Sequence, residues 1–298
     1  MTPPRQILPG QNFEVCVRTH GRELSLTATT EVRDLVLYVF AIAAERHNVT
    51  LHTLCVLFSH FHLGGCDNDG RLPEFMAYAD SLIARALNCR YARDDKFWSG
   101  DGYHLLRPQT PEDLIERAVY VCCNPAAAGL VDRLEDYPGL VIGPRDIGRA
   151  ITVQRPKFFF REDGKMPAHA TIRFEVPGEF ADLGRDRYVA LLERRVKERE
   201  REHRAERKAA GRSVMGAKRL REVRPDARAK SWEQWFQMRP TIAARLTSVR
   251  VAAIRALREF RAAYREAWER FAAGDRNVEF PAGTWWVVRH ASARAAPS

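Results

Sequence analysis

The 298-residue sequence predicts an α+β domain followed by a mostly helical, basic C-terminal region. Within residues 11–124, short apolar or alternating stretches typical of strands are interleaved with stretches of helical periodicity. Their order, strand–helix–strand–strand–helix–strand–helix, is that of a ferredoxin-like α+β sandwich. The net charge also differs between the two halves of the chain. Residues 1–149 hold 15 basic and 19 acidic side chains, whereas residues 150–298 carry a net charge of about +14. We therefore expect two domains, 1–149 and 150–298.

The first elements follow from local patterns. Residues 11–19 alternate polar and apolar side chains, which predicts an edge or one-sided strand. Residues 31–48 form an amphipathic pattern preceded by Thr29 and Thr30, either of which can cap the start of a helix. Residues 50–63 are rich in strand-forming side chains, and we expect strand structure there with a bend or break.

The remaining elements of the first domain are two helices and a strand between them. We expect helices over residues 72–89 and 111–124 and a short strand over residues 103–106. The second helix is expected to end at Asn124, because proline follows at position 125 and disfavours helical backbone before it.

The second half of the chain is predicted to be loop-rich at first and then helical. Residues 141–185 contain two possible short strands, at 158–160 and 172–174. Residues 188–210 form a charged helix in which opposite charges recur three or four positions apart. Residues 213–224 resemble a small basic helix.

The C-terminal end is predicted to be mostly helical over residues 232–272 and to finish with a strand over residues 280–289. Three aromatic side chains would anchor the start of this region, and a stripe at helical spacing would form core. The anchors are Trp232, Trp235 and Phe236, and the stripe is Leu257, Phe260, Tyr264, Trp268 and Phe271.

Two histidines in the apolar segment LCVLFSHFHLGG, residues 54–65, are candidates for a metal site. On a buried strand, His60 and His62 point to one face while Phe61 points to the core. Two imidazoles held side by side are a plausible pair of metal ligands. The alternative is a pair of ordinary polar histidines.

Tyr120 and Asn124 stand four positions apart on the predicted helix and therefore on one face. A tyrosine nucleophile and an amide oxygen able to complete a metal site would be presented together. The alternative is a half-buried tyrosine followed by the end of a helix.

In their order and spacing these motifs resemble the single-tyrosine HUH transposases, in particular the REP-associated tyrosine transposase branch. The resemblance covers roughly residues 8–140. It rests on SHFHL at 59–63, LPEFM at 72–76, FW at 97–98, YVCCNPAAAGLV at 120–131 and DYP at 136–138. The chain departs from the family pattern at Ser59, where asparagine is common, at Gly64 and Gly65, where apolar residues are usual, and at Cys122 and Cys123, where His-Leu is usual.

The resemblance implies an enzyme that cleaves and rejoins single-stranded DNA at hairpin-containing sites through a 5′-phosphotyrosine formed on Tyr120. It implies an HUH endonuclease domain with an antiparallel sheet, the histidines on a central strand, and a divalent metal, Mg²⁺ or Mn²⁺, held by His60, His62 and Asn124. It also implies a homodimer, in which the tyrosine helix is often exchanged. Two alternatives stay open: a catalytically silent DNA-binding protein derived from such an enzyme, and a replication-initiator or relaxase nickase.

Basic side chains outside these motifs are candidates for phosphate contact, although a solvated surface is the alternative reading. Residues 185–230 hold 17 basic and 8 acidic side chains, so their charges do not cancel. The candidates are Arg85, Arg90, Arg93, Arg212, Lys218, Arg219 and Arg221.

The sequence has no apolar run of about 18 residues and no apolar signal-peptide segment at its N-terminus. We therefore expect no membrane contact and a cytoplasmic, nucleoid-associated location. The six cysteines show no Cys-x-x-Cys spacing, which indicates reduced thiols and argues against a cysteine-based zinc site.

Overall fold

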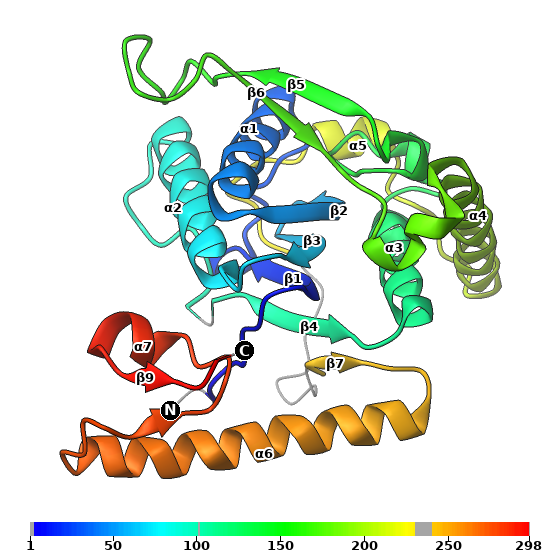
Figure 1. Cartoon of the computed structure of the whole chain (residues 1–298). Helices are drawn as coiled ribbons and strands as arrows, with labels where there is room; N and C mark the ends of the chain where they lie inside the picture. The colour runs from blue at the N-terminus through cyan, green and yellow to red at the C-terminus, as the bar shows by residue number, and fades with distance from the viewer. Residues whose placement is uncertain (1–2, 101, 230–239, 298) are drawn as a thin grey trace.

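The computed structural model describes residues 3–100, 102–229 and 240–297, and a five-stranded sheet runs through it (Figure 1). The strand order is β2-β3-β1-β4-β7, with every pair antiparallel except β4 and β7. The strands are β1 (Gln11–Arg18), β2 (Val49–Leu57), β3 (His60–Asp67), β4 (His104–Pro108) and β7 (Ile242–Ala243). The first four strands thus have the order of a ferredoxin-like sheet, and β1 and β3 are its central strands.

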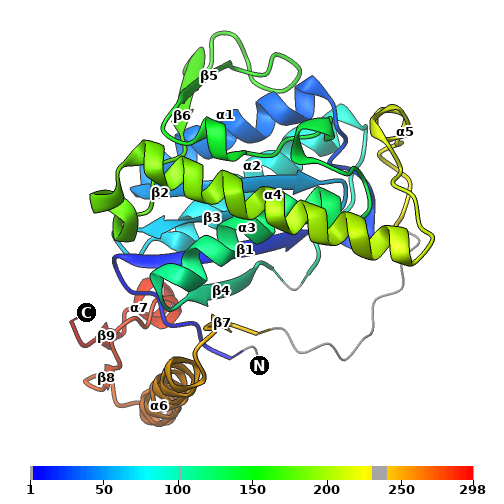
Figure 2. The same cartoon turned by 90° about the vertical axis from the view of Figure 1, so that its right-hand side faces the viewer.

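Helices cover both faces of the sheet. α1 (Thr30–His47) and α2 (Leu72–Arg90) lie on one face, and α3 (Pro111–Ala127) lies on the other with α4 (Arg185–Ala209) packed outside it (Figures 1 and 2). The predicted α+β sandwich is therefore confirmed, with α4 as an additional outer layer.

Aromatic packing holds the α1–α2 layer on the sheet. The Phe61 ring of β3 lies 5.4 Å from that of Phe40 in α1, which in turn lies 6.0 Å from that of Phe75 in α2. All three side chains are buried, so each removes a large apolar area from water. This packing fixes which face of β3 is turned inward.

Threonine caps fix the starts of two helices, and the cap at Thr29 was expected. The Thr29 hydroxyl accepts a hydrogen bond from the backbone N–H of Val32, and Thr110 does the same for Asp113. Each cap satisfies one of the free N–H groups in a first helical turn.

The bend or break expected within residues 50–63 is a hairpin turn, since β2 ends at Leu57 and β3 begins at His60. One boundary in the first half differs from expectation. α3 does not stop at Asn124 but passes through Pro125 to Ala127. The proline lies in the last turn and removes only its own N–H, while the N–H of Ala128 still bonds to the carbonyl of Asn124.

The chain beyond residue 149 first forms a hairpin of β5 (Ala150–Gln154) and β6 (His169–Arg173), which packs against α1. The predicted strand at 158–160 is absent: these residues lie in turns, although Phe158, Phe159 and Phe160 still pack on the core. The same core cluster includes side chains of β5, β6 and α4, so it continues past residue 149. The domain division at that residue stays a prediction.

The rest of the chain is mostly helical. The predicted basic helix over 213–224 is shorter, and the predicted strand over 280–289 is wrong. Glu279–Phe280 forms a two-residue strand, and Thr284 makes an isolated β-bridge with Gln6. After a turn at Gly283 (φ +83°) the chain becomes helical with Val287 buried. The elements are α5 (Ala217–Arg221), α6 (Thr247–Ala272), β8 (Glu279–Phe280), α7 (Trp286–Ala291) and β9 (Arg294–Ala295). Short 3-10 helices span His20–Arg22, Leu134–Asp136, Pro144–Asp146 and Gly178–Leu183.

The aromatic stripe of α6 is core, as predicted. Phe260 and Phe271 are buried, and Tyr264 and Trp268 pack into the small cluster that α6 forms with residues 278–295. Leu257, the remaining stripe residue, lines a cleft described below. The anchors Trp232, Trp235 and Phe236 lie outside the described residues. No helix in the described ranges is both long and apolar enough to cross a membrane.

Candidate active site

The two histidines lie at the start of β3, on the face opposite α1 and α2. Their ring centroids are 5.3 Å apart, and Phe61 between them points into the core, as the strand period predicts. Since β3 pairs with both β1 and β2, the histidines are on a central strand.

Tyr120 projects from α3 toward this histidine pair. Its ring centroid lies 5.5 Å from that of His62, and its side chain is 38% exposed. Asn124, one turn further along α3, is buried, and its Nδ2 atom has no hydrogen-bond partner among the described residues. Structure and sequence therefore agree in bringing His60, His62, Tyr120 and Asn124 to one place within a single chain.

A buried carboxylate joins the histidines to the tyrosine helix. Glu14 of β1 lies within 2.9 Å of His62 Nδ1 and accepts hydrogen bonds from Arg117 Nε at 2.5 Å and Nη2 at 2.8 Å. The Arg117 guanidinium stacks on Tyr120, with its Cζ 4.0 Å from the ring centroid. One side chain thus orients both a candidate metal ligand and the cation that covers the candidate nucleophile.

Glu14 and Arg117 were missed by the sequence analysis, although signals for both exist. Glu14, Cys16 and Arg18 occupy alternate positions of β1 and therefore share one face. Arg117 precedes Tyr120 by three residues and therefore lies on the same side of α3.

Burial and nearby charges give the two histidines very different pKa values. Burial, with the nearby charges of His62, Arg18 and Arg22, lowers the pKa of His60 to about 3, so its ring is neutral near pH 7. Burial would also lower the pKa of His62, but its hydrogen bonds to Cys16 and Glu14 raise that pKa to about 9. Burial would raise the pKa of Glu14, but the hydrogen bonds from His62 and Arg117 hold that pKa below its ordinary value.

Tyr120 keeps its proton in this environment. Burial and the negative charge of Glu14 raise its pKa above the ordinary value, against the opposing effects of Arg117 and Asn124. Cleavage chemistry at this hydroxyl would need further positive charge or a base near the oxygen.

The residues present fit a divalent metal. The Nδ1 atom of His62 is engaged by Glu14 and that of His60 lies 3.2 Å from Ser59 Oγ, which leaves both Nε2 atoms as candidate donors. The carboxylate–histidine pair is the outer-shell arrangement common at metal-bound imidazoles. Asn124 lies one turn beyond Tyr120 on α3, and the carbonyl oxygen of its side chain would offer a third ligand of neutral charge. Because His62 holds a proton here, metal binding would release it.

A cleft of about 1240 Å³ opens beside Tyr120 and His62. Its other side is formed by residues 240–272, hereafter the C-terminal arm, which comprises β7 and α6 and runs along the β4 edge of the sheet (Figure 1). Among the described lining residues, Glu14 is the one acidic side chain. Seven are arginines: Arg5, Arg18, Arg22, Arg107, Arg117, Arg250 and Arg261. The cleft therefore favours an anionic ligand.

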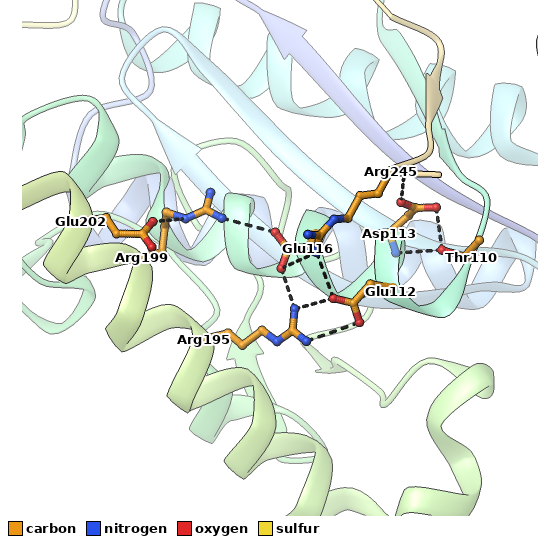
Figure 3. A network of polar contacts seen from close by, with 8 residues as sticks. All are labelled: Thr110, Glu112, Asp113, Glu116, Arg195, Arg199, Glu202 and Arg245. Atoms are coloured by element: carbon orange, nitrogen blue, oxygen red, sulfur yellow. Dashed lines mark hydrogen bonds and ion pairs between the residues drawn. The ribbon is translucent and has the colours of Figure 1, made fainter. Parts of the chain in front are cut away.

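Ion pairs hold the start of the tyrosine helix in place (Figure 3). Glu112 and Glu116 of α3 pair with Arg195 of α4, and Glu116 pairs also with Arg199. Acidic side chains in a first helical turn also interact favourably with the helix dipole. α4 thus fixes the helix that carries Tyr120.

Three predicted DNA-contacting arginines lie on or just after α2, which covers the opposite face of the sheet. Arg85 is exposed, Arg90 lies 3.6 Å from Glu31, and Arg93 is bound by both Asp95 and Glu23. They do not join the active-site cleft, and two already have acidic partners.

The other four candidates, Arg212, Lys218, Arg219 and Arg221, lie on or near α5 and are exposed. α5 is attached through Leu220, which is buried in a small cluster with Phe58 and Val121. These four side chains do not line the cleft, and their role as DNA contacts stays a prediction.

No protein-family model matches the chain, and no curated protein matches it. One similar solved structure is described as a REP-associated tyrosine transposase bound to a REP hairpin: it is 17% identical over 48% of this chain and 82% of that chain, with a TM-score of 0.42. Another is described as a "putative transposase" from Deinococcus radiodurans R1, with 18% identity over 36% of this chain and 85% of that chain and a TM-score of 0.28. Both likenesses concern the fold, and neither assigns a role to any residue of this chain.

Proposed function

We propose that the chain is a single-tyrosine HUH transposase that cleaves and rejoins single-stranded DNA at hairpin-containing sites. The observation that carries the proposal is the contact of Tyr120 with His62, 5.5 Å between ring centroids, at a cleft rich in arginine. Phosphodiester transfer through a covalent enzyme intermediate needs a nucleophile and a means of stabilising charge on the phosphate, and a tyrosine beside two imidazoles and an amide can supply both.

In the proposed reaction the Tyr120 oxygen attacks a DNA phosphorus. A bond forms between that oxygen and phosphorus, the bond from phosphorus to the 3′-oxygen breaks, and the 3′-oxygen takes up a proton as the tyrosine gives one up. The 5′-phosphotyrosine keeps the phosphoester bond, so another 3′-OH can reverse the step and join a new strand. DNA transposition and recombination can use this reversibility to join strands without a separate energy source.

The surrounding side chains would prepare this step. Arg117, stacked on the Tyr120 ring, favours the ionised tyrosine, and Glu14 fixes both Arg117 and His62. His60, His62 and Asn124 would hold Mg²⁺ or Mn²⁺, which when bound supplies positive charge to the scissile phosphate. Imidazole ligands favour Mn²⁺ of the two. The proposed homodimer, with or without exchange of α3, belongs to the same proposal.

The test is a covalent adduct. We would incubate the chain with Mn²⁺ and labelled single-stranded hairpin oligonucleotides and separate the products on a denaturing gel. Wild type should give a slowly migrating protein–DNA band that is absent from Tyr120→Phe and His60→Ala. Tyr78→Phe is the matched control, since Tyr78 lies on α2, on the far face of the sheet, and should leave the band unchanged.

The outcomes separate the candidates. A band that persists in Tyr120→Phe would contradict the assignment of the nucleophile. Salt-sensitive DNA binding without any band, over many hairpins, would favour a catalytically silent DNA-binding protein.

A further inference from the structure

Three arginines line the cleft close together: Arg5 and Arg107 from residues before the C-terminal arm, and Arg261 from the arm itself. Arg5 of the N-terminal segment stacks on Tyr103, with its Cζ 4.1 Å from the ring centroid, and donates a hydrogen bond to the Tyr103 carbonyl. Arg107 lies on β4, and its backbone pairs directly with β7 of the arm. Arg261 comes from α6, and all three side chains line the same cleft.

These three guanidinium groups have no acidic partner in the described parts of the chain. The Nε atom of Arg261 is buried and makes no hydrogen bond there. Burial, with the like charges of Arg5 and Arg261, lowers the pKa of Arg107 to about 10, against the weaker opposing effects of Tyr103 and Asp67, neither of which forms an ion pair with Arg107. The guanidinium groups of Arg93, Arg117 and Arg195, by contrast, are paired with carboxylates.

Like charges held together without a counter-charge are unfavourable unless an anion joins them. Guanidinium groups bind phosphate oxygens in a bidentate manner, and a cluster can contact one phosphate from several directions. The cleft also contains Tyr120 and His62, so an anion at this cluster and a phosphate at the tyrosine can belong to one bound strand.

We propose that Arg5, Arg107 and Arg261 bind a second backbone phosphate of the DNA strand, at a position separate from the phosphate that Tyr120 attacks. This inference rests on the proposed function and extends it. The C-terminal arm completes the strand-binding cleft, and its contribution is independent of base sequence.

The test measures binding of a fluorescent single-stranded hairpin oligonucleotide to Tyr120→Phe protein at several salt concentrations. Adding Arg261→Gln should weaken binding roughly tenfold and reduce the slope of log affinity against log salt by about 0.7, the value of one phosphate contact on a single strand. Arg5→Gln should act in the same direction. Arg258→Gln is the matched control, because Arg258 is an exposed arginine of α6 outside the cleft, and it should change neither quantity appreciably.

A second arm of the experiment locates the phosphate. Oligonucleotides with a single uncharged methylphosphonate are scanned along the strand. One position should weaken binding to the Tyr120→Phe protein roughly tenfold and weaken it less in the presence of Arg261→Gln, because two groups that contact each other have non-additive effects.

Equal affinities and salt slopes for Arg261→Gln and Arg258→Gln would overturn the inference. If wild type still forms the Tyr120 adduct, the proposed function survives that result. Arginine-dependent binding without any adduct would support the phosphate site and reject the transposase chemistry. Absence of any strand binding would reject both.

Discussion

At the scale of single residues, Glu14 explains how a strand and a helix present a common site. The carboxylate is 4% exposed and contacts both the imidazole of His62 and the guanidinium of Arg117. A buried carboxylate with two cationic partners is costly to disturb, because removing it leaves both partners unpaired. We therefore regard Glu14 as a positioning residue that does not itself meet substrate.

Glu14→Gln should weaken Mn²⁺ binding by roughly 10–100-fold, since outer-shell partners of metal-bound imidazoles have effects of that size. Calorimetric titration with Mn²⁺ measures the change. Glu45→Gln, at an exposed position of α1, serves as the control and should bind Mn²⁺ like wild type. Unchanged Mn²⁺ affinity in Glu14→Gln would show that Glu14 does not support a metal ligand.

Asp80 on α2 makes the stability of the fold depend on pH. Burial raises the pKa of this carboxyl to about 8, and its Oδ1 atom has no hydrogen-bond partner among the described residues. The folded state therefore favours the protonated form. Its contribution to stability is fully present below about pH 4, the unfolded pKa, and is lost as the pH rises through 8.

Asp80→Asn should consequently raise the free energy of unfolding at pH 9, by on the order of 1–3 kcal/mol, and change it little at pH 4. Denaturant unfolding at the two pH values measures the difference. Asp182→Asn, at an exposed site, should follow the wild-type pH dependence. A stability gain for Asp80→Asn that is equal at both pH values would contradict the argument.

At the scale of elements, the close approach of β2 and β3 depends on two glycines. A Cβ atom on Gly65 would collide with the backbone carbonyl of Thr50 and lie 2.9 Å from Phe13 Cζ, next to the register shift between Leu51 and Thr53. A Cβ atom on Gly64 would collide with Thr53 Oγ1, so both Gly64 and Gly65 allow this pairing.

Gly65→Ala should lower the free energy of unfolding by about 1–3 kcal/mol, because the strands must separate to accept a methyl group. Gly178→Ala provides a control, since nothing lies within 4 Å of the added atom. Urea denaturation followed by tryptophan fluorescence compares the two. Equal stability of both variants would mean that the strand pair adapts without cost.

Sequence periodicity predicted most elements of the sandwich because each has one buried face. The alternation of residues 11–19 predicted β1, and the capping threonine predicted the start of α1. A break within residues 50–63 was expected, but its position could not be predicted, because both strands are almost wholly buried and the apolar pattern continues on each side of the turn at Phe58 and Ser59. The α7 helix was missed because six residues are too few to show a helical period.

The same reasoning explains which site residues could be predicted. His60 with His62 and Tyr120 with Asn124 are close in sequence, so strand and helix periods place each pair together. Glu14 and Arg261 reach the cleft only through the strand order and the path of the C-terminal arm, which local patterns do not encode.

At the scale of the whole molecule, the C-terminal arm is attached at the helix that carries the candidate nucleophile. The Asp113 carboxylate of α3 is 3% exposed; its Oδ1 accepts the backbone N–H of Arg245 at 2.7 Å, and its Oδ2 accepts the hydroxyl of Thr110 at 2.6 Å. β7 continues the attachment, because the N–H of Gln109 bonds to the carbonyl of Ala243 at 3.0 Å. These hydrogen bonds therefore fix the position of the C-terminal arm, which forms one side of the cleft, relative to Tyr120 on the other.

Asp113→Ala should release the arm, because it removes the acceptor of the part-buried Arg245 N–H, at a cost of about 1–3 kcal/mol. Hydrogen exchange followed by mass spectrometry should then show faster exchange at the start of α6, while β1 and β3 remain protected.

Glu112→Gln makes a useful contrast. Its ion pair with Arg245, 3.2 Å long, joins two exposed side chains and should contribute less than about 1 kcal/mol. Equal exchange in the two variants would show that the arm is held by other contacts, whereas selective release by Asp113→Ala would establish that one buried carboxylate couples the tyrosine helix to the far side of the cleft.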